Sequence, residues 1–194
     1  MFVFGYKLSP KFIPVEFIPS KNYMNTFSLP KKGDFPTYYK TYLSKISDEN
    51  FSGQILRQVN ELREFFQSKG TGWDSKAYGE GKWTPKEILG HLLDTERIMM
   101  FRALCFVRGE QQALPGFDQD QYVQNGKFNG VSIDLLFKDF EAQRNSLLTF
   151  IHTLDESILD IVGNANGKPI TPRALFWIIS GHFTHHFNIL KERY

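Results

Sequence analysis

Three histidines spaced like metal ligands are the residues best suited to chemistry in this chain of 194 residues. His182 and His186 are four residues apart, and His91 lies in a second apolar stretch. On a helix, residues i and i+4 lie on one face about one turn apart, so both imidazoles can bind one ion. Three imidazoles in an apolar core would otherwise strand several donors and acceptors. The pattern predicts a divalent-metal site made by His91, His182 and His186.

A site with three histidine ligands has the form of a catalytic rather than a structural zinc site, because at least one coordination position stays open. Nitrogen ligands favour zinc, nickel or iron over magnesium and calcium, which prefer oxygen. The open position could activate water for hydrolysis or hold a thiol as thiolate for transfer, and the sequence does not separate these routes. The alternative interpretation is that each histidine is a core residue hydrogen-bonded to a neighbour.

Two carboxylates follow His91 in the same stretch. Asp94 and Glu96 come three and five residues after it, so either could orient an imidazole or act as a general base. Carboxylates on a helix face are more often exposed members of ion pairs. Asp94 and Glu96 are therefore candidate catalytic residues, with ion pairing as the alternative.

Candidate pocket residues lie further along the same stretch and in the loop after it. Arg102 and Arg144 both fall on apolar stripes. They are either core arginines in ion pairs, with Glu96 as one partner, or pocket cations for an anionic substrate. Tyr122 lies among polar and aromatic residues of the loop. Arg102 and Tyr122 are the candidate cofactor-binding residues.

Four stretches carry apolar residues at helical spacing, at about 48–69, 84–108, 132–154 and 171–194. Thr84-Pro85 and Thr171-Pro172 each offer an N-cap followed by proline, and Ser132 is a further candidate cap. No segment alternates convincingly with a period of two residues. The sequence predicts an all-α protein whose architecture is a four-helix bundle.

The connection at 109–131 is longer than most bundle loops. A loop of this length can run along the bundle and start the third helix parallel to the second, which gives an up-down-down-up order. His91 is about 10 Å from the start of its helix, and His186 about 10 Å from the end of its own. An antiparallel arrangement of these two helices brings the histidines to one level.

Residues 1–46 contain five prolines and no sustained period, which predicts an irregular N-terminal extension. Met24 could be the natural start, in which case residues 1–23 are not native. The bundle domain is expected at 47–194.

The composition excludes several classes of protein. Hydrophobic residues make up 41% and charged residues 23%, with a net charge of +2 from interspersed charges and no basic stripe, so nucleic acid is not expected as a partner. No apolar run is long enough to cross a membrane. A single cysteine, Cys105, excludes an intramolecular disulfide and favours a reducing, cytoplasmic location.

The segments GHLLDTERIMMFRAL, LPGFDQDQYV and ALFWIISGHFTHHFNILKERY resemble the DinB-like (DinB/YfiT type) superfamily over about residues 50–194. The resemblance implies an up-down-down-up bundle with a divalent-metal site at His91, His182 and His186. The superfamily includes thiol-dependent transferases and isomerases that use low-molecular-weight thiols, and metal-dependent hydrolases. It therefore implies a transferase or hydrolase acting on a small molecule. The alternatives are a non-catalytic metal-binding or stress-associated bundle, and an interaction module without metal.

The chain contains 19 phenylalanines, more than a bundle of this size is expected to bury. We expect part of this apolar surface to form a homodimer interface. The candidate patches are Phe65 with Phe66, Met99 to Phe101, and Phe183 with Phe187. The alternative is that the N-terminal extension folds back and covers them.

Overall fold

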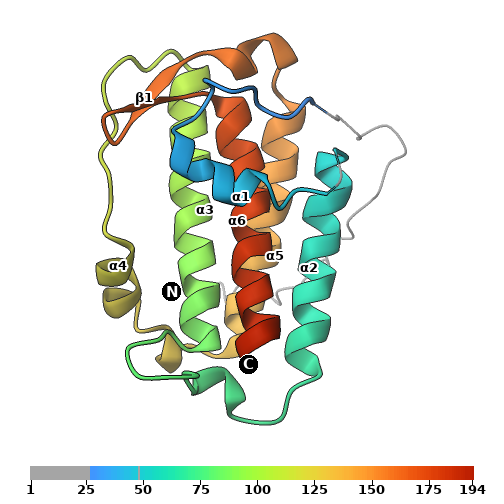
Figure 1. Ribbon diagram of the computed structural model, residues 1–194. Helices are drawn as coiled ribbons and strands as arrows, with labels where there is room; N and C mark the ends of the chain where they lie inside the picture. Colours follow the sequence, from blue (N-terminus) through green and yellow to red (C-terminus); the bar gives the residue numbers. More distant parts are fainter. Residues whose placement is uncertain (1–26, 48) are drawn as a thin grey trace, which may run out of the picture.

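Four long helices form the body of the protein in the computed structural model, which describes residues 27–47 and 49–194 (Figure 1). They are α2 (Phe51–Gln67), α3 (Pro85–Val107), α5 (Ile133–His152) and α6 (Pro172–Arg193). Each lies within one of the four stretches predicted from apolar spacing. The predicted all-α four-helix bundle is confirmed.

The order of the helices is also the predicted one. In Figure 1, α2 and α6 run in one direction and α3 and α5 in the other, which is the up-down-down-up arrangement. The connection between α3 and α5 runs the length of the bundle along its outer side. Because α3 and α6 are antiparallel neighbours, the start of one lies beside the end of the other.

The start of α3 is fixed by a complete capping box. Thr84 Oγ1 accepts a hydrogen bond from the Glu87 backbone N–H at 3.2 Å, and a Glu87 carboxylate oxygen accepts one from the Thr84 N–H at 2.8 Å. Asn129, at the end of the long connection, accepts from the Thr84 hydroxyl at 2.7 Å and donates to Glu87 at 3.0 Å. These bonds set where the helix begins, and therefore the level of His91 seven residues later.

The long connection contains two short helices that the sequence did not reveal, α4 (Gln119–Gly126) and η3 (Phe128–Gly130). Asp118 caps α4 by accepting hydrogen bonds from two backbone N–H groups. The helix has one buried residue, Val123, which leaves no apolar period to detect. Phe128 packs against α3 at Gly90, where a Cβ atom would lie 2.2 Å from the ring.

A small hairpin precedes α6, where the sequence showed no alternation. Strands β1 (Gly163–Ala165) and β2 (Lys168–Ile170) pair antiparallel, following the short helix η4 (Glu156–Asp160). Their turn is Asn166-Gly167 with both φ angles positive, which suits an Asn-Gly hairpin. Leu114 exchanges backbone hydrogen bonds with Asn164 and Asn166, so the long connection is tied to the hairpin.

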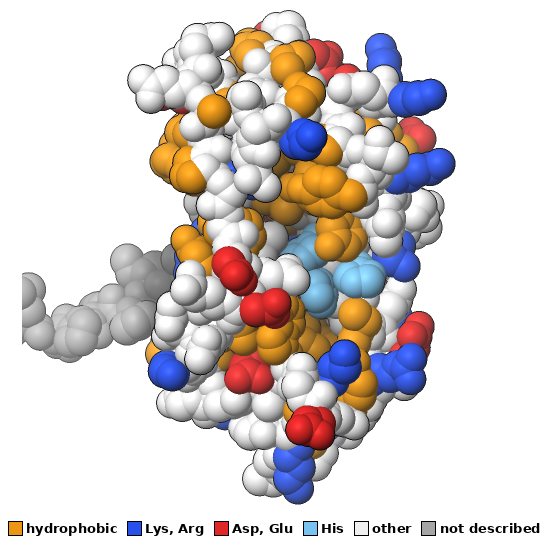
Figure 2. All heavy atoms as spheres, turned by 60° about the vertical axis from the view of Figure 1, so that its left-hand side comes forward, with side chains coloured by type: hydrophobic (Ala, Val, Ile, Leu, Met, Phe, Trp, Pro, Cys, Tyr) orange, Lys and Arg blue, Asp and Glu red, His pale blue; other side chains and the backbone are white. Residues whose placement is uncertain are grey.

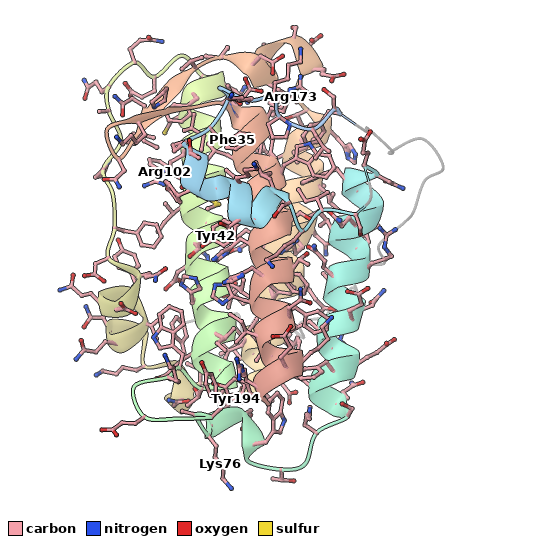
Figure 3. All side chains as sticks on the ribbon, in the orientation of Figure 1. Phe35, Tyr42, Lys76, Arg102, Arg173 and Tyr194 are labelled. Atoms are coloured by element: carbon pink, nitrogen blue, oxygen red, sulfur yellow. The ribbon has the colours of Figure 1, made fainter. Side chains whose placement is uncertain are left out.

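The described part of the N-terminal extension packs against the bundle and includes η1 (Thr37–Tyr39) and α1 (Lys40–Leu43). Phe27 is buried against Phe51 and Trp177. Arg173, labelled at one end of the bundle in Figure 3, donates to the Ser28 carbonyl. The proposal that residues 1–23 are not native, and the predicted helix start near residue 48, lie outside the described residues.

Replacing Gly181 by alanine is expected to destabilise the protein by about 1–3 kcal/mol. A Cβ atom there would lie 2.4 Å from the Tyr42 carbonyl oxygen, so α1 would have to move away from α6. Alanine is a better helix former than glycine by about 1 kcal/mol, so a net loss of stability would come from the clash of the new Cβ atom with Tyr42. Urea unfolding measures the change. Gly70→Ala, where no atom lies within 4 Å, is the control and should unfold as the wild type does.

Most of the residues proposed for a dimer interface are buried within the chain. Phe66, Met99, Phe183 and Phe187 are all less than 9% exposed, because they pack between the helices. Phe101 alone among the named patches is largely exposed, at 55%. The proposed patches therefore do not form a continuous apolar surface. Within residues 27–47 and 49–194, no helix is both long and apolar enough to cross a membrane.

Candidate metal centre

The histidines lie where the two apolar clusters of the core meet. Ile179 belongs to the cluster nearer the hairpin, and Phe183 to the cluster nearer the C-terminus, so His182 falls between them on α6. In Figure 2, histidine side chains are visible in a hollow with hydrophobic side chains above and below. The site is thus set in the core but reached from one face of the molecule.

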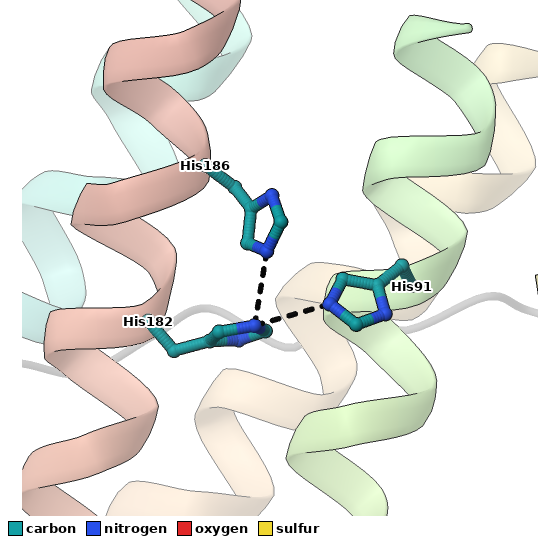
Figure 4. A group of neighbouring side chains, drawn as sticks. All are labelled: His91, His182 and His186. Atoms are coloured by element: carbon teal, nitrogen blue, oxygen red, sulfur yellow. Dashed lines mark hydrogen bonds between the residues drawn. The ribbon is translucent and has the colours of Figure 1, made fainter. Parts of the chain in front are cut away.

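Three imidazole nitrogens converge at this position (Figure 4). His182 Nε2 lies 3.0 Å from His91 Nε2 and 3.0 Å from His186 Nε2. One nitrogen from each ring lies within 4.8 Å of the other two. The pair at 182 and 186 comes from successive turns of α6, and His91 faces it from the antiparallel α3. The predicted level of all three residues is therefore the observed one.

Hydrogen bonding alone cannot satisfy these contacts. A neutral imidazole Nε2 carries either one proton or one lone pair, so His182 Nε2 can form one good hydrogen bond but not two. A cation that accepts all three lone pairs removes this conflict. Metal–nitrogen bonds of about 2.0–2.1 Å place neighbouring ligand nitrogens about 3 Å apart. The three side chains fit a divalent metal with nitrogen ligands.

The residues around the ligands fix their orientation and exclude water. Thr95 Oγ1 lies 3.4 Å from His91 Nδ1; as acceptor for Nδ1–H it would leave the Nε2 lone pair for a metal. Trp83 packs against His91, with ring centroids 4.7 Å apart, and Tyr42 packs against His182 at 5.1 Å. His185 contacts both Tyr42 and His186, so it is a packing residue beside the site.

Burial keeps all three imidazoles neutral at pH 7. It lowers the pKa of His91 to about 4 and that of His186 to about 2. The pKa of His182 is lowered well below its usual value, again by burial first and by the neighbouring histidines second. A neutral imidazole is the form that binds a metal, so no proton has to be displaced near neutral pH.

The metal-free protein is expected to lose stability as the pH falls from 6.5 toward 4. The unfolded chain protonates its histidines near pH 6.5, whereas folded His91 resists protonation until about pH 4. The unfolded state therefore binds more protons, and acid favours unfolding. The free energy of unfolding keeps its full value above pH 6.5. For His91 alone, it falls by about 3 kcal/mol by the time the pH is below 4. Urea unfolding of chelator-treated protein at about pH 7 and about pH 4.5 measures it. An unfolding free energy that did not change over this range would contradict the buried neutral histidines.

The two candidate catalytic carboxylates do not belong to the histidine group. Asp94 is part-exposed and lies 3.8 Å from Arg97 on the same helix. Glu96 is buried and pairs with Arg144 at 2.9 Å. The ligand cluster contains histidines only. Both carboxylates are thus held in ion pairs with arginines, outside the histidine group, and a catalytic role for either of them stays a prediction.

The pair of Glu96 and Arg144 belongs to a polar layer that crosses the bundle, with one side chain from each long helix. Arg144 donates to Gln58 Oε1 at 2.8 Å, and Gln58 donates to the Ser180 carbonyl and hydroxyl at 3.0 Å. Ser180 is two residues from the ligand His182. The sequence suggested the ion pair as one option for Arg144, but the glutamine and serine carried no signal, because isolated polar residues on an apolar stripe have no motif.

A cavity of about 180 Å³ adjoins the histidines. His91 and His182 line it together with Arg102, three tyrosines of the N-terminal segment and residues of the long connection. Tyr122 does not line it; this tyrosine is 44% exposed and its ring contacts Phe117. The structure thus brings Arg102 but not Tyr122 to the pocket. A larger hollow of about 510 Å³ near Trp73 contains no histidine.

A family profile for the DinB superfamily matches residues 54–190, which includes the whole histidine group, all of α3 and α5, and α2 and α6 apart from one outer turn each. The chain belongs to the DinB superfamily. The match covers more than two thirds of the sequence, and it confirms the family suggested by the sequence motifs.

Two relatives of this DinB-superfamily chain carry descriptions of activity. The Oceanobacillus iheyensis protein named "Putative metal-dependent hydrolase OB0413" is 26% identical over 140 residues, which is 71% of this chain and 80% of that protein. YfiT from Bacillus subtilis, described as a probable metal-dependent hydrolase with an unusual four-helix bundle topology, matches with a TM-score of 0.63. It is 14% identical and covers 86% of this chain and 93% of its own, so it shows the fold alone.

Proposed function

We propose that this protein is a metal-dependent hydrolase of a small molecule, in which His91, His182 and His186 hold one zinc, nickel or iron ion. The observation that carries the proposal is the position of His182 Nε2, at 3.0 Å from the Nε2 atoms of both other histidines. When bound, such a metal is a Lewis acid that lowers the pKa of a coordinated water or thiol.

The chain's own residues would support this chemistry in three ways. Trp83 and Tyr42 pack on the ligand rings and exclude bulk water from them. Thr95 Oγ1, 3.4 Å from His91 Nδ1, would accept a hydrogen bond from Nδ1–H in the tautomer that leaves the Nε2 lone pair for a metal. The cavity beside His91 and His182 gives a small substrate access to the ligands. The name of the Oceanobacillus iheyensis relative, a metal-dependent hydrolase, supports hydrolysis as the reaction class.

Thiol-dependent transfer is the second candidate. The ligand set is three neutral imidazoles, so a bound divalent ion would keep its full positive charge. Such a centre favours an anionic partner, and a thiol is readily held there as thiolate. A low-molecular-weight thiol would then be a cosubstrate of the same site.

Activity assays separate the candidates. Protein loaded with zinc, nickel or iron would be tested on a panel of small esters and amides, and on electrophiles supplied with low-molecular-weight thiols. Hydrolysis that is lost with a chelator and in His182→Ala supports the first candidate. Turnover that requires the thiol supports the second. If the loaded protein does neither, but its metal raises the melting temperature, the centre is structural instead.

A homodimer and a cytoplasmic location are further parts of the proposal. Light scattering of the full chain at tens of micromolar tests the dimer. Phe101 and Leu104, exposed on α3 at 55% and 40%, are the apolar residues from which an interface would be built. A dimer that persists in Phe101→Ser with Leu104→Ser would contradict that placement.

A further inference from the structure

Three arginines of the described residues are buried, and they differ in their partners. Arg144 pairs with Glu96 at 2.9 Å, and Arg173 pairs with Asp160 at 2.6 Å. Arg102 is 4% exposed, but none of the carboxylates described in the structure forms an ion pair with it. A buried guanidinium is costly unless an anion compensates its charge. Of these three buried arginines, Arg102 is thus the one without a carboxylate partner among the described residues.

The surroundings of Arg102 leave part of its guanidinium free for a ligand. Nη2 donates to the Pro115 carbonyl at 2.7 Å, which anchors one edge of the group. The Phe117 ring lies 5.9 Å from the guanidinium carbon. Asn166 and Gln119 line the same cavity and add neutral polar groups near it. In Figure 3, Arg102 is labelled close to one end of α1, and Tyr42 of α1 lines the same cavity.

The cavity connects Arg102 with the metal ligands. His91, Thr95, Met99 and Arg102 follow one another along α3 at spacings of four, four and three, so they share one face. Arg102 and His91 are eleven residues apart on α3, and both line the same cavity. Met99 and the Phe117 ring lie in the cavity lining as apolar surface.

We infer that Arg102 forms a subsite for the carboxylate of an anionic substrate, whose reacting end lies at His91 and His182. This rests on the proposed function and adds the class of substrate to it. The substrate has a carboxylate at one end and an apolar middle that contacts Met99 and Phe117. It is small, because the cavity of about 180 Å³ is below the usual size of ligand pockets.

Binding of hexanoate to metal-free protein tests the subsite without relying on the metal. Hexanoate, its neutral amide hexanamide and inorganic phosphate would be titrated into the wild type, Arg102→Gln and Arg97→Gln, with binding followed by NMR. Arg97 is the matched control, because it lies on the same helix but pairs with Asp139 at the surface. We expect hexanoate to bind the wild type more tightly than hexanamide or phosphate. Arg102→Gln should weaken it about 10-fold or more, and Arg97→Gln should leave it unchanged.

The melting temperature of the ligand-free variants separates a binding role from a structural one. An arginine held for a ligand contributes an uncompensated buried charge, so Arg102→Gln should melt within about 2 °C of the wild type or higher. Arg102→Lys should keep part of the affinity, because it retains the charge but loses the planar fork.

The inference is overturned if Arg102→Gln binds hexanoate as tightly as the wild type does. It is also overturned if phosphate or hexanamide binds better than hexanoate, or if Arg102→Gln melts several degrees lower. None of these readouts needs a metal. A protein that binds hexanoate through Arg102 but never binds metal would therefore refute the proposed function and leave the subsite standing.

Discussion

Replacing His182 by alanine is expected to lower the affinity for zinc or nickel by at least about 100-fold. His182 Nε2 is the nitrogen that lies 3.0 Å from both other ligand nitrogens, so its loss leaves two imidazoles on different helices. Removing even a hydrogen-bond partner of a ligand costs about 10–100-fold in metal affinity, and removing the ligand itself costs more. Competition with a chromogenic chelator, on protein purified without a histidine tag, measures the change.

The control for this experiment is His152→Ala. His152 ends α5 and does not belong to the histidine group, so its removal should leave the affinity within about twofold of the wild type. Equal losses in the two variants would mean that the metal is bound elsewhere or nonspecifically.

Replacing Glu96 by leucine is expected to destabilise the protein by about 3–5 kcal/mol. The carboxylate and the Arg144 guanidinium are 3% and 1% exposed, so the arginine would be left as an uncompensated buried charge. The polar layer through Gln58 would lose its ionic member as well. Thermal and urea unfolding of the metal-free variant measure the loss.

A double variant and a surface control make this prediction specific. Glu96→Leu combined with Arg144→Met removes both charges, and it should recover most of the lost stability. Asp94→Asn breaks a part-exposed contact with Arg97, so it should cost no more than about 1 kcal/mol. If Glu96→Leu were as mild as Asp94→Asn, the buried pair would not hold the four helices together as described.

The long helices and the histidine cluster were predictable because their signals are repeated along the chain. Each helix shows an apolar stripe over many residues, and threonine or serine caps mark the starts of α3, α5 and α6. The spacing of His182 and His186 fixes a common face, and the long connection fixes the direction of α6 relative to α3. The apolar period, the helix caps and the loop length together predicted that His91 lies at the level of His182 and His186.

The parts that the sequence did not predict depend on single contacts between distant residues. Helix α4 and the hairpin are too short to show a period. Backbone hydrogen bonds with Leu114 hold the hairpin, and α4 has a single buried residue, Val123. Glu96 was a candidate for a catalytic role or an ion pair, and the ion pair depends on the position of Arg144 on α5, which the sequence does not give. Tyr122 looked like a pocket residue from its neighbours, but α4 turns it outward.

The polar layer and the metal centre lie between the two apolar clusters of the bundle interior. Apolar clusters lie on both sides, and Ser180 joins the layer two residues before the ligand His182. Hydrogen bonds to Ser180 from Gln58 therefore fix α6 next to the site. A small displacement of α6 would separate His182 from His91, so the layer positions the ligands as well as stabilising the fold.

X-ray absorption spectroscopy at the edge of the bound metal is the most direct test of the metal centre. The protein would be expressed without a histidine tag and measured as purified, with its metal-to-protein ratio determined on the same sample. We expect about one zinc, nickel or iron ion per chain, with a spectrum dominated by imidazole nitrogen and no sulfur shell. A sample with no more metal than His182→Ala, or a sulfur ligand from Cys105, would contradict the site at His91, His182 and His186.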